Sequence, residues 1–86
     1  MTIPVGDYNW IEEDGNWSLY NRSGQMLTGW QKELDKWFYF DSQGIMQTGW
    51  FKDTDGKWYF LNKDGSMACN TTVDGYVLNQ SGACVR

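Results

Sequence analysis

The sequence predicts an all-β fold: a solenoid of stacked β-hairpins, with about three full repeats and a C-terminal cap. The first observation behind this prediction is an internal repeat, visible in the overlapping windows 9–30, 29–50 and 49–70. The second is that short aromatic runs of high strand propensity recur inside it, Trp-Phe-Tyr-Phe at 37–40 and Trp-Tyr-Phe-Leu at 58–61. No segment has the apolar period and the caps of a helix.

The repeats share anchor residues at fixed positions. Each unit opens with a tryptophan and has a second one seven or eight residues later; a glycine then follows, with a methionine two residues after it. The anchors are Trp10, Trp30 and Trp50; Trp17, Trp37 and Trp58; Gly24, Gly44 and Gly65; and Met26, Met46 and Met67. We therefore expect a leader or linker at 1–8 and one module at 9–86, divided into units 9–28, 29–48 and 49–69 and a shortened fourth unit, the cap, at 70–86.

Turn residues separate the strands within a unit. Glu-Asp-Gly-Asn at 13–16 and Asp-Thr-Asp-Gly at 53–56 favour hairpin turns. One hairpin is not stable alone in water, so stacking must bury an apolar face of each. Because side chains alternate along a strand, Trp37 and Tyr39 share one face while the two flanking phenylalanines share the other. One set can form the core and the other a set of binding sites.

Composition and charge exclude several classes of function. The net charge of −4 argues against nucleic acid, which is bound through basic patches. No apolar run is long enough to cross a bilayer, so no membrane insertion is expected. The chain has no His, no nucleophilic triad and no metal-ligand cluster, and it is predicted to be neither an enzyme nor a cofactor protein. The acidic run Glu12-Glu13-Asp14 is interpreted as a solvated hairpin tip.

The aromatic residues point instead to binding. Six Trp, five Tyr and four Phe cannot all be buried in 86 residues. Some of them must line a surface, and exposed aromatic clusters usually mark binding sites.

Each repeat starts with Gly-Trp, continues with a Trp followed by aromatic residues, and ends with Gly-x-Met-x-Thr-Gly-Trp. This pattern resembles the choline-binding repeats of surface proteins, autolysins and phage lysins. The resemblance covers residues 9–86. It implies a solenoid of hairpins that binds the choline headgroup of phosphocholine on teichoic acids, in cavities between consecutive hairpins. It also implies an extracellular, cell-wall-associated module, whose secretion signal we expect in a longer parent protein. A quaternary ammonium suits such cavities because it is recognised by aromatic faces.

The resemblance also implies which residues bind. The first choline site would combine Trp10 and Trp17 with Tyr39 and Met46 of the next unit, and the second would combine Trp30 and Trp37 with Phe60 and Met67. A third would start from Trp50 and Trp58, where the cap offers Tyr76, Val77 and Leu78. The pattern does not decide which aromatic residue of the next strand closes each site.

The two cysteines, Cys69 and Cys84, both lie near the C-terminal end. In an exported small domain such a pair is predicted to form a disulfide. The alternative is two separate small buried residues, with Cys84 in a position occupied by methionine in the earlier units.

Two other functions stay open. Related aromatic repeats bind glucans or other glycans by stacking on sugar rings, and a structural or oligomerisation spacer could bury all its aromatic residues. Because solenoid ends with an atypical cap can dimerise, a homodimer through one end also stays open.

Overall fold

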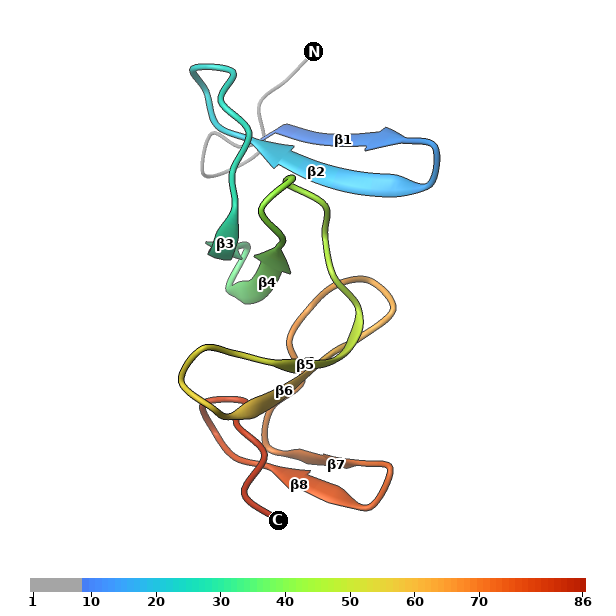
Figure 1. Cartoon of the computed structure of the whole chain (residues 1–86), viewed down its shortest axis with the longest axis vertical. Coiled ribbons are helices and arrows are strands. Elements are labelled where there is room, and N and C mark those ends of the chain that lie inside the picture. Colours follow the sequence, from blue (N-terminus) through green and yellow to red (C-terminus); the bar gives the residue numbers. More distant parts are fainter. Residues whose placement is uncertain (1–8) are drawn as a thin grey trace. The chain divides into compact units, whose positions relative to one another are not determined.

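The structure, a computed structural model, describes residues 9–86. The leader or linker predicted at 1–8 lies outside these residues. Across the described chain all regular structure is β, with eight strands paired as four antiparallel hairpins (Figure 1). The prediction of an all-β fold built from β-hairpins is confirmed.

The hairpins follow one another along the chain, each formed by two consecutive strands. The strands are β1 (Asn9–Glu13), β2 (Asn16–Tyr20), β3 (Gly29–Glu33), β4 (Lys36–Phe40), β5 (Gly49–Lys52), β6 (Trp58–Leu61), β7 (Thr71–Val73) and β8 (Tyr76–Leu78). The chain divides into two compact units. The first ends at Gln47 and contains β1–β4, and the second spans Thr48–Arg86 and contains β5–β8.

Tight turns join most of the strand pairs. Asp14-Gly15 and Asp74-Gly75 both have positive φ at the two central positions, as a type I′ turn requires. Leu34 and Asp35 adopt the same conformation, with φ of 55° and 65°, although neither is a glycine. The third hairpin has a longer turn, in which Asp53 and Lys57 are hydrogen-bonded through their backbones.

Each hairpin is followed by a loop that returns to its second strand. In the first unit, the Leu27 amide donates to the Leu19 carbonyl, and Met26 bridges to Tyr20. Phe40 and Met46 form the same bridge after the second hairpin. These loops therefore place Met26 and Met46 beside the last residue of the preceding strand.

The first unit has its core between its two hairpins. Leu19 and Phe40 are fully buried and Phe38 nearly so, with Trp10, Leu27 and Met46 packed around them. Burial of each large apolar side chain contributes about 1.5–3 kcal/mol. In Figure 1, β3–β4 runs across the direction of β1–β2, so the core lies where two hairpin faces cross.

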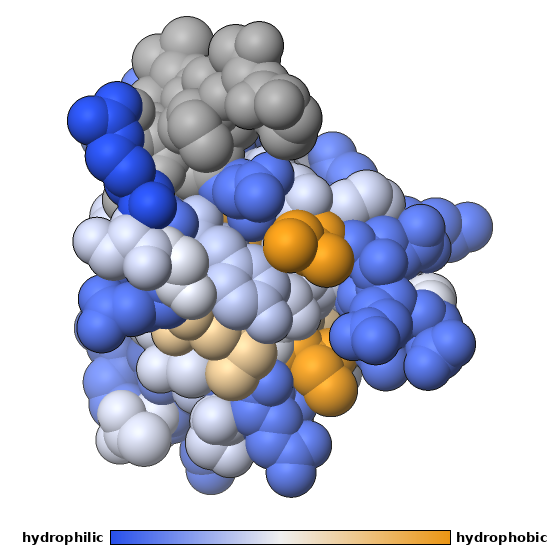
Figure 2. Space-filling model, turned by 90° about the horizontal axis from the view of Figure 1, so that it is seen from above, coloured by the Kyte–Doolittle hydropathy of each residue, from blue (hydrophilic) through white to orange (hydrophobic). Residues whose placement is uncertain are grey.

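The second unit has a smaller core. Leu61 and Leu78, from its two hairpins, are fully buried, and Ala68 and Ala83 from the following loops are nearly so. On the face of the molecule drawn in Figure 2, hydrophilic side chains dominate and strongly hydrophobic ones form small separate patches. The described residues include no helix of the length and apolarity that a membrane span needs.

Candidate functional site

The two tryptophans of each of the first three hairpins lie on one face of it, because of the strand register. The first Trp of each strand pair stands directly opposite a large apolar residue: Trp10 opposite Leu19, Trp30 opposite Tyr39, and Trp50 opposite Phe60. The second Trp stands opposite the residue two positions after the first. Since side chains two residues apart share a face, both indoles project to the same side.

In the first unit, Trp10 is the centre of an aromatic cluster. Its ring lies 6.3 Å from Trp17, 5.0 Å from Phe38 and 5.8 Å from Phe40, measured between centroids. The first two contacts are edge-to-face, an arrangement that places the positive edge of one ring against the negative face of another. Trp17 is 39% exposed, so one wall of the cluster remains accessible from solvent.

Met46 joins this cluster, as the sequence predicts. Its amide donates to the Trp17 carbonyl at 2.9 Å, and its side chain packs on the core of Leu19, Phe38 and Phe40. The structure therefore brings together Trp10, Trp17 and Met46.

Tyr39, predicted as the closing residue, lies elsewhere. Its ring packs 5.2 Å from Trp30 of its own hairpin, on the face opposite Phe38 and Phe40. Phe38 stands against Trp10 in its place. The reason is strand alternation: neighbouring positions of β4 point to opposite faces, and the even-numbered ones turn towards the first hairpin.

Trp30 and Trp37 form a second pair of indoles in the first unit. Their centroids are 6.5 Å apart and their planes are nearly perpendicular. Lys32, directly opposite Trp37 in the hairpin, places its ammonium 6.0 Å from the Trp37 ring. This pair can thus accept a positive charge from its own chain. Phe60 and Met67, predicted to complete a site with it, belong to the second unit, and their shared site stays a prediction.

In the second unit, Trp50 packs edge-to-face between two rings. Phe60, directly opposite it in the hairpin, lies 5.1 Å away, and Tyr76 of β8 lies 5.5 Å away. A cavity of about 450 Å³ opens beside these rings, lined by Trp50, Trp58, Tyr76 and Cys84. Such a volume lies within the range of about 300–1,000 Å³ usual for small-molecule sites. Three of the residues expected at the third site, Trp50, Trp58 and Tyr76, thus line this cavity, and its role as a choline site stays a prediction.

Met67 lies against a glycine in the second unit. A Cβ built on Gly82 would lie only 2.5 Å from the Met67 sulfur, and in the first unit Met26 approaches Gly44 in the same way. The methionine that follows one loop glycine thus packs on the glycine of the next loop. The predicted role of Met67 as a wall of a choline site stays a prediction.

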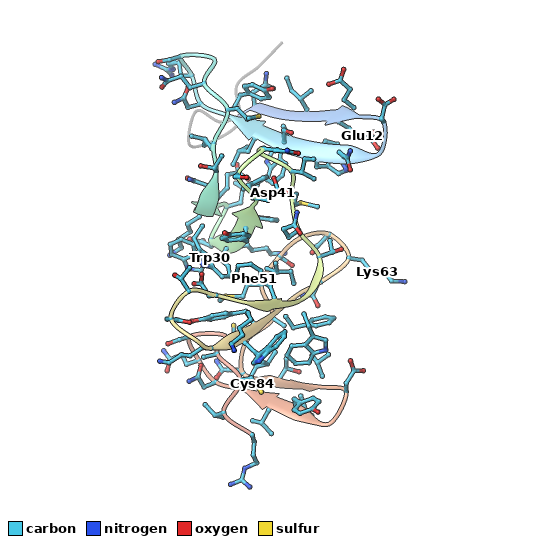
Figure 3. All side chains as sticks on the ribbon, in the orientation of Figure 1. Glu12, Trp30, Asp41, Phe51, Lys63 and Cys84 are labelled. Carbon is cyan, nitrogen blue, oxygen red and sulfur yellow. The ribbon has the colours of Figure 1, made fainter. Side chains whose placement is uncertain are left out.

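The cysteines are not bonded to each other. Cys69 is an exposed free thiol, and Cys84 is a free, half-buried one beside the β7–β8 hairpin (Figure 3). The predicted disulfide is therefore corrected. The Cys84 amide donates to the Trp58 carbonyl at 2.8 Å, as Met46 does to Trp17, so the backbone holds Cys84 in the methionine position. The alternative interpretation of Cys84 agrees with this placement.

Two carboxylates that the sequence pattern does not identify accept hydrogen bonds from the central indoles. Trp10 Nε1–H donates to Glu33 Oε1 at 3.1 Å, and Trp50 Nε1–H donates to Asp74 Oδ2 at 3.1 Å. Glu33 is buried, whereas Asp74 is exposed. Both carboxylates lie in or next to a hairpin turn, where the sequence indicates only solvated residues. Phe38 was also missed, although the alternation of β4 would have identified it once the register was known.

Two side chains at the turn of the third hairpin, Tyr59 and Asp55, have shifted pKa values. Burial, together with a hydrogen bond to Asp55 at 2.8 Å, raises the pKa of Tyr59 to about 12. A backbone hydrogen bond from Lys57 and the Tyr59 hydroxyl lower the pKa of the Asp55 carboxyl. These groups fix the long turn of the third hairpin. Among residues 9–86, no three His, Cys, Asp or Glu side chains gather as a metal site.

Known proteins resemble this chain in sequence and fold. The family model for the choline-binding repeat matches residues 27–71, and that for a putative cell wall binding repeat matches residues 9–26. No curated protein matches significantly.

Among solved structures, the choline-binding domain of Spr1274 from Streptococcus pneumoniae is 40% identical, with a TM-score of 0.86 over 96% of this chain and 100% of that one. Choline-binding protein F, solved in complex with ipratropium, is 41% identical, with a TM-score of 0.84 over 90% of this chain and 25% of that one. The pneumococcal cell wall endolysin of phage Cp-1, complexed with choline, is 32% identical, with a TM-score of 0.83 over 98% and 26%.

The chain thus spans about a quarter of choline-binding protein F and of the endolysin, and nearly all of it aligns with a whole choline-binding domain. The family model alone matches more than half of the chain. The chain belongs to the choline-binding repeat family.

Proposed function

We propose that the chain is a non-catalytic cell-wall-binding module that recognises the choline headgroups of phosphocholine-decorated teichoic acids and anchors a parent protein to the wall, outside the cell. The observation that carries this proposal is the cavity of the second unit, walled by Trp50, Trp58 and Tyr76. The cluster of Trp10, Trp17, Phe38 and Met46 supplies a comparable set of groups in the first unit.

These walls suit a quaternary ammonium. Such a cation has no N–H to donate, so its ammonium group forms no conventional hydrogen bonds. It gains instead from the negative faces of aromatic rings, each worth about 0.5–2 kcal/mol. A polarisable sulfur adds van der Waals contact with the ligand and needs no hydrogen-bond partner. Met46 supplies this sulfur in the first unit, and Cys84 supplies it in the second.

The relatives support the same ligand class. The phage Cp-1 endolysin is complexed with choline, and choline-binding protein F is complexed with ipratropium. In both, a segment like this chain is about a quarter of the protein. We therefore place any catalytic activity of a parent protein outside the segment and assign binding to this chain.

A ligand comparison tests the proposal. Choline should quench the tryptophan fluorescence and raise the melting temperature, since a ligand that binds only the folded form stabilises it by about 2.7 kcal/mol at 100 times Kd. Dextran at matched mass concentration should do neither. Stabilisation by dextran without any response to choline would assign the chain to glucan binding instead.

Wall binding tests the cellular part of the proposal. Several weak sites on one chain, engaging a polymer that carries many cholines, raise the overall affinity without new contacts. The module should bind choline-bearing walls and be released by free choline. Release by salt but not by choline would indicate charge attraction by the acidic surface, and would contradict the proposal.

A further inference from the structure

Glu33 is a buried carboxylate that the hairpin fold alone does not require. It ends β3, next to the Leu34-Asp35 turn, and is only 3% exposed. Its Oε1 accepts the indole N–H of Trp10. Its Oε2 is buried and has no hydrogen-bond partner within residues 9–86.

A carboxylate in this position is destabilising unless something compensates its charge. Burial without pairing removes hydration that one hydrogen bond does not replace. Because the carboxylate contacts the edge of the Trp10 indole, a cation held over that ring, within about 6 Å of its centroid, lies within about 10 Å of the negative charge. The bound ligand would then supply the missing positive charge through a medium that screens weakly.

The charges around the two central indoles differ. In the first unit, Glu12 stands opposite Trp17, so two carboxylates flank the cluster, the buried one being Glu33. In the second unit, the carboxylate at Trp50 is the exposed Asp74, and a lysine, Lys52, stands opposite Trp58. Solvent screens an exposed carboxylate much more strongly than a buried one.

We propose that Glu33 is a specificity-determining residue of the first-unit cluster: its buried charge orients Trp10 and makes this site select a cationic headgroup over an uncharged ligand of the same shape. The inference rests on the proposed function, since it assigns a cation to that cluster. It also makes the two units unequal. The cluster at Trp10 discriminates by charge, and the cavity at Trp50 discriminates more by shape.

The test compares choline with its uncharged carbon analogue, in which a quaternary carbon replaces the nitrogen. The indole N–H resonances of Trp10 and Trp50, assigned by NMR, report the two sites separately within one protein. Glu33→Gln keeps the side-chain length and an oxygen that can accept the Trp10 N–H, and removes the charge. Glu13→Gln is the matched control, because Glu13 is an exposed residue of the same unit on the opposite face of its hairpin from Trp10.

At low salt, Glu33→Gln should weaken choline binding at Trp10 about two- to fifteenfold, the range given by an effective dielectric constant between that of water and about 20. The affinity for the carbon analogue should stay the same or rise, and Glu13→Gln should change neither. Equal loss of both ligands in Glu33→Gln would show a purely structural role, and unchanged choline affinity would show no role; either result overturns the inference. If choline shifted no indole resonance in the unaltered protein, the proposed function would fail as well.

A second measurement needs no variant, in case Glu33→Gln does not fold. The ratio of choline affinity to analogue affinity should be larger at Trp10 than at Trp50, and added salt should reduce it less at Trp10, because a buried charge is screened less than an exposed one. A ratio that is equal at the two sites, or that falls equally with salt, overturns the inference.

Discussion

Replacing Gly44 with alanine should destabilise the first unit through two separate effects. Gly44 has φ of +78°, a conformation that costs an L-residue about 1–2 kcal/mol. A Cβ at this position would also collide with the Sδ, Cγ and Cε of Met26. Because these atoms end a flexible side chain that is 41% exposed, Met26 can move aside, at a cost of about 0.5–1.5 kcal/mol. The free energy of unfolding should therefore fall by about 1.5–3.5 kcal/mol.

Gly24 provides a matched control for the backbone effect. Its φ is +84°, close to that of Gly44, but a Cβ there would meet nothing within 4 Å. Gly24→Ala should cost only about 1–2 kcal/mol. The combination of Gly44→Ala with Met26→Ala removes the colliding atoms, so its cost beyond that of Met26→Ala alone should match the cost of Gly24→Ala.

Thermal unfolding followed by circular dichroism measures these differences, because 1 kcal/mol shifts the melting temperature by about 4–8 °C in a domain of this size. Two results would refute the reasoning. One is equal loss in Gly24→Ala and Gly44→Ala. The other is a double variant that is no better than expected from adding the two single changes, which would mean that Met26 and Gly44 do not pack together.

Three further predictions concern the second unit. Tyr76→Ala should remove one wall of the cavity and weaken choline binding there by about 0.5–2 kcal/mol, whereas Val77→Ala, on the opposite face of β8, should leave choline binding unchanged. Site-resolved NMR titration compares the two variants, and equal effects would contradict the assignment. Choline should slow alkylation of Cys84, measured by mass spectrometry, and leave that of the exposed Cys69 unchanged, whereas equal protection would place the ligand elsewhere. The pKa of Tyr59 is raised to about 12 in the folded protein, so the contribution of Tyr59 to the free energy of unfolding is complete below pH 10 and is lost as the pH rises towards 12. In Tyr59→Phe this part of the pH dependence of stability should disappear. An unchanged alkaline stability profile would refute the assignment.

The fold was predictable because its signals are local. Asp14-Gly15 identifies a type I′ hairpin turn on its own, and the aromatic runs at 37–40 and 58–61 identify strands. The turn at Leu34-Asp35 has no such signal, since leucine rarely adopts positive φ. The cross-strand pairing of Trp30 with Tyr39 and of Gln31 with Phe38 fixes the register, and the turn must accommodate it.

The pairing of side chains between hairpins was harder to predict. The sequence shows that Phe38 and Tyr39 lie on opposite faces, but not which face turns towards the first hairpin. That choice depends on how Leu19 and Phe40 pack, and both are fully buried. The sequence pattern therefore predicts Tyr39 at Trp10, where the structure has Phe38.

The prediction of a disulfide between Cys69 and Cys84 fails for a related reason. Spacing and an exported context favour a disulfide in a small domain, but position in the repeat has more weight here. The amide of Cys84 bonds to the Trp58 carbonyl, as that of Met46 bonds to the Trp17 carbonyl. The repeat thus assigns the sulfur of Cys84 to a cavity wall.

The comparison of the two units also explains how one repeat can give sites of different character. Two contacts are the same in both units. The amides of Met46 and Cys84 each donate to the carbonyl of the second tryptophan of the preceding hairpin. The indoles of Trp10 and Trp50 each donate to a carboxylate at 3.1 Å. The two carboxylates differ in exposure. Glu33 ends a strand of the longer β3–β4 hairpin and is buried, whereas Asp74 lies in the turn of the shorter β7–β8 hairpin and is exposed. The rings differ too, since Phe38 packs on Trp10 and Tyr76 packs on Trp50. One repeat can therefore give sites that differ both in their aromatic contacts and in the nearby negative charge.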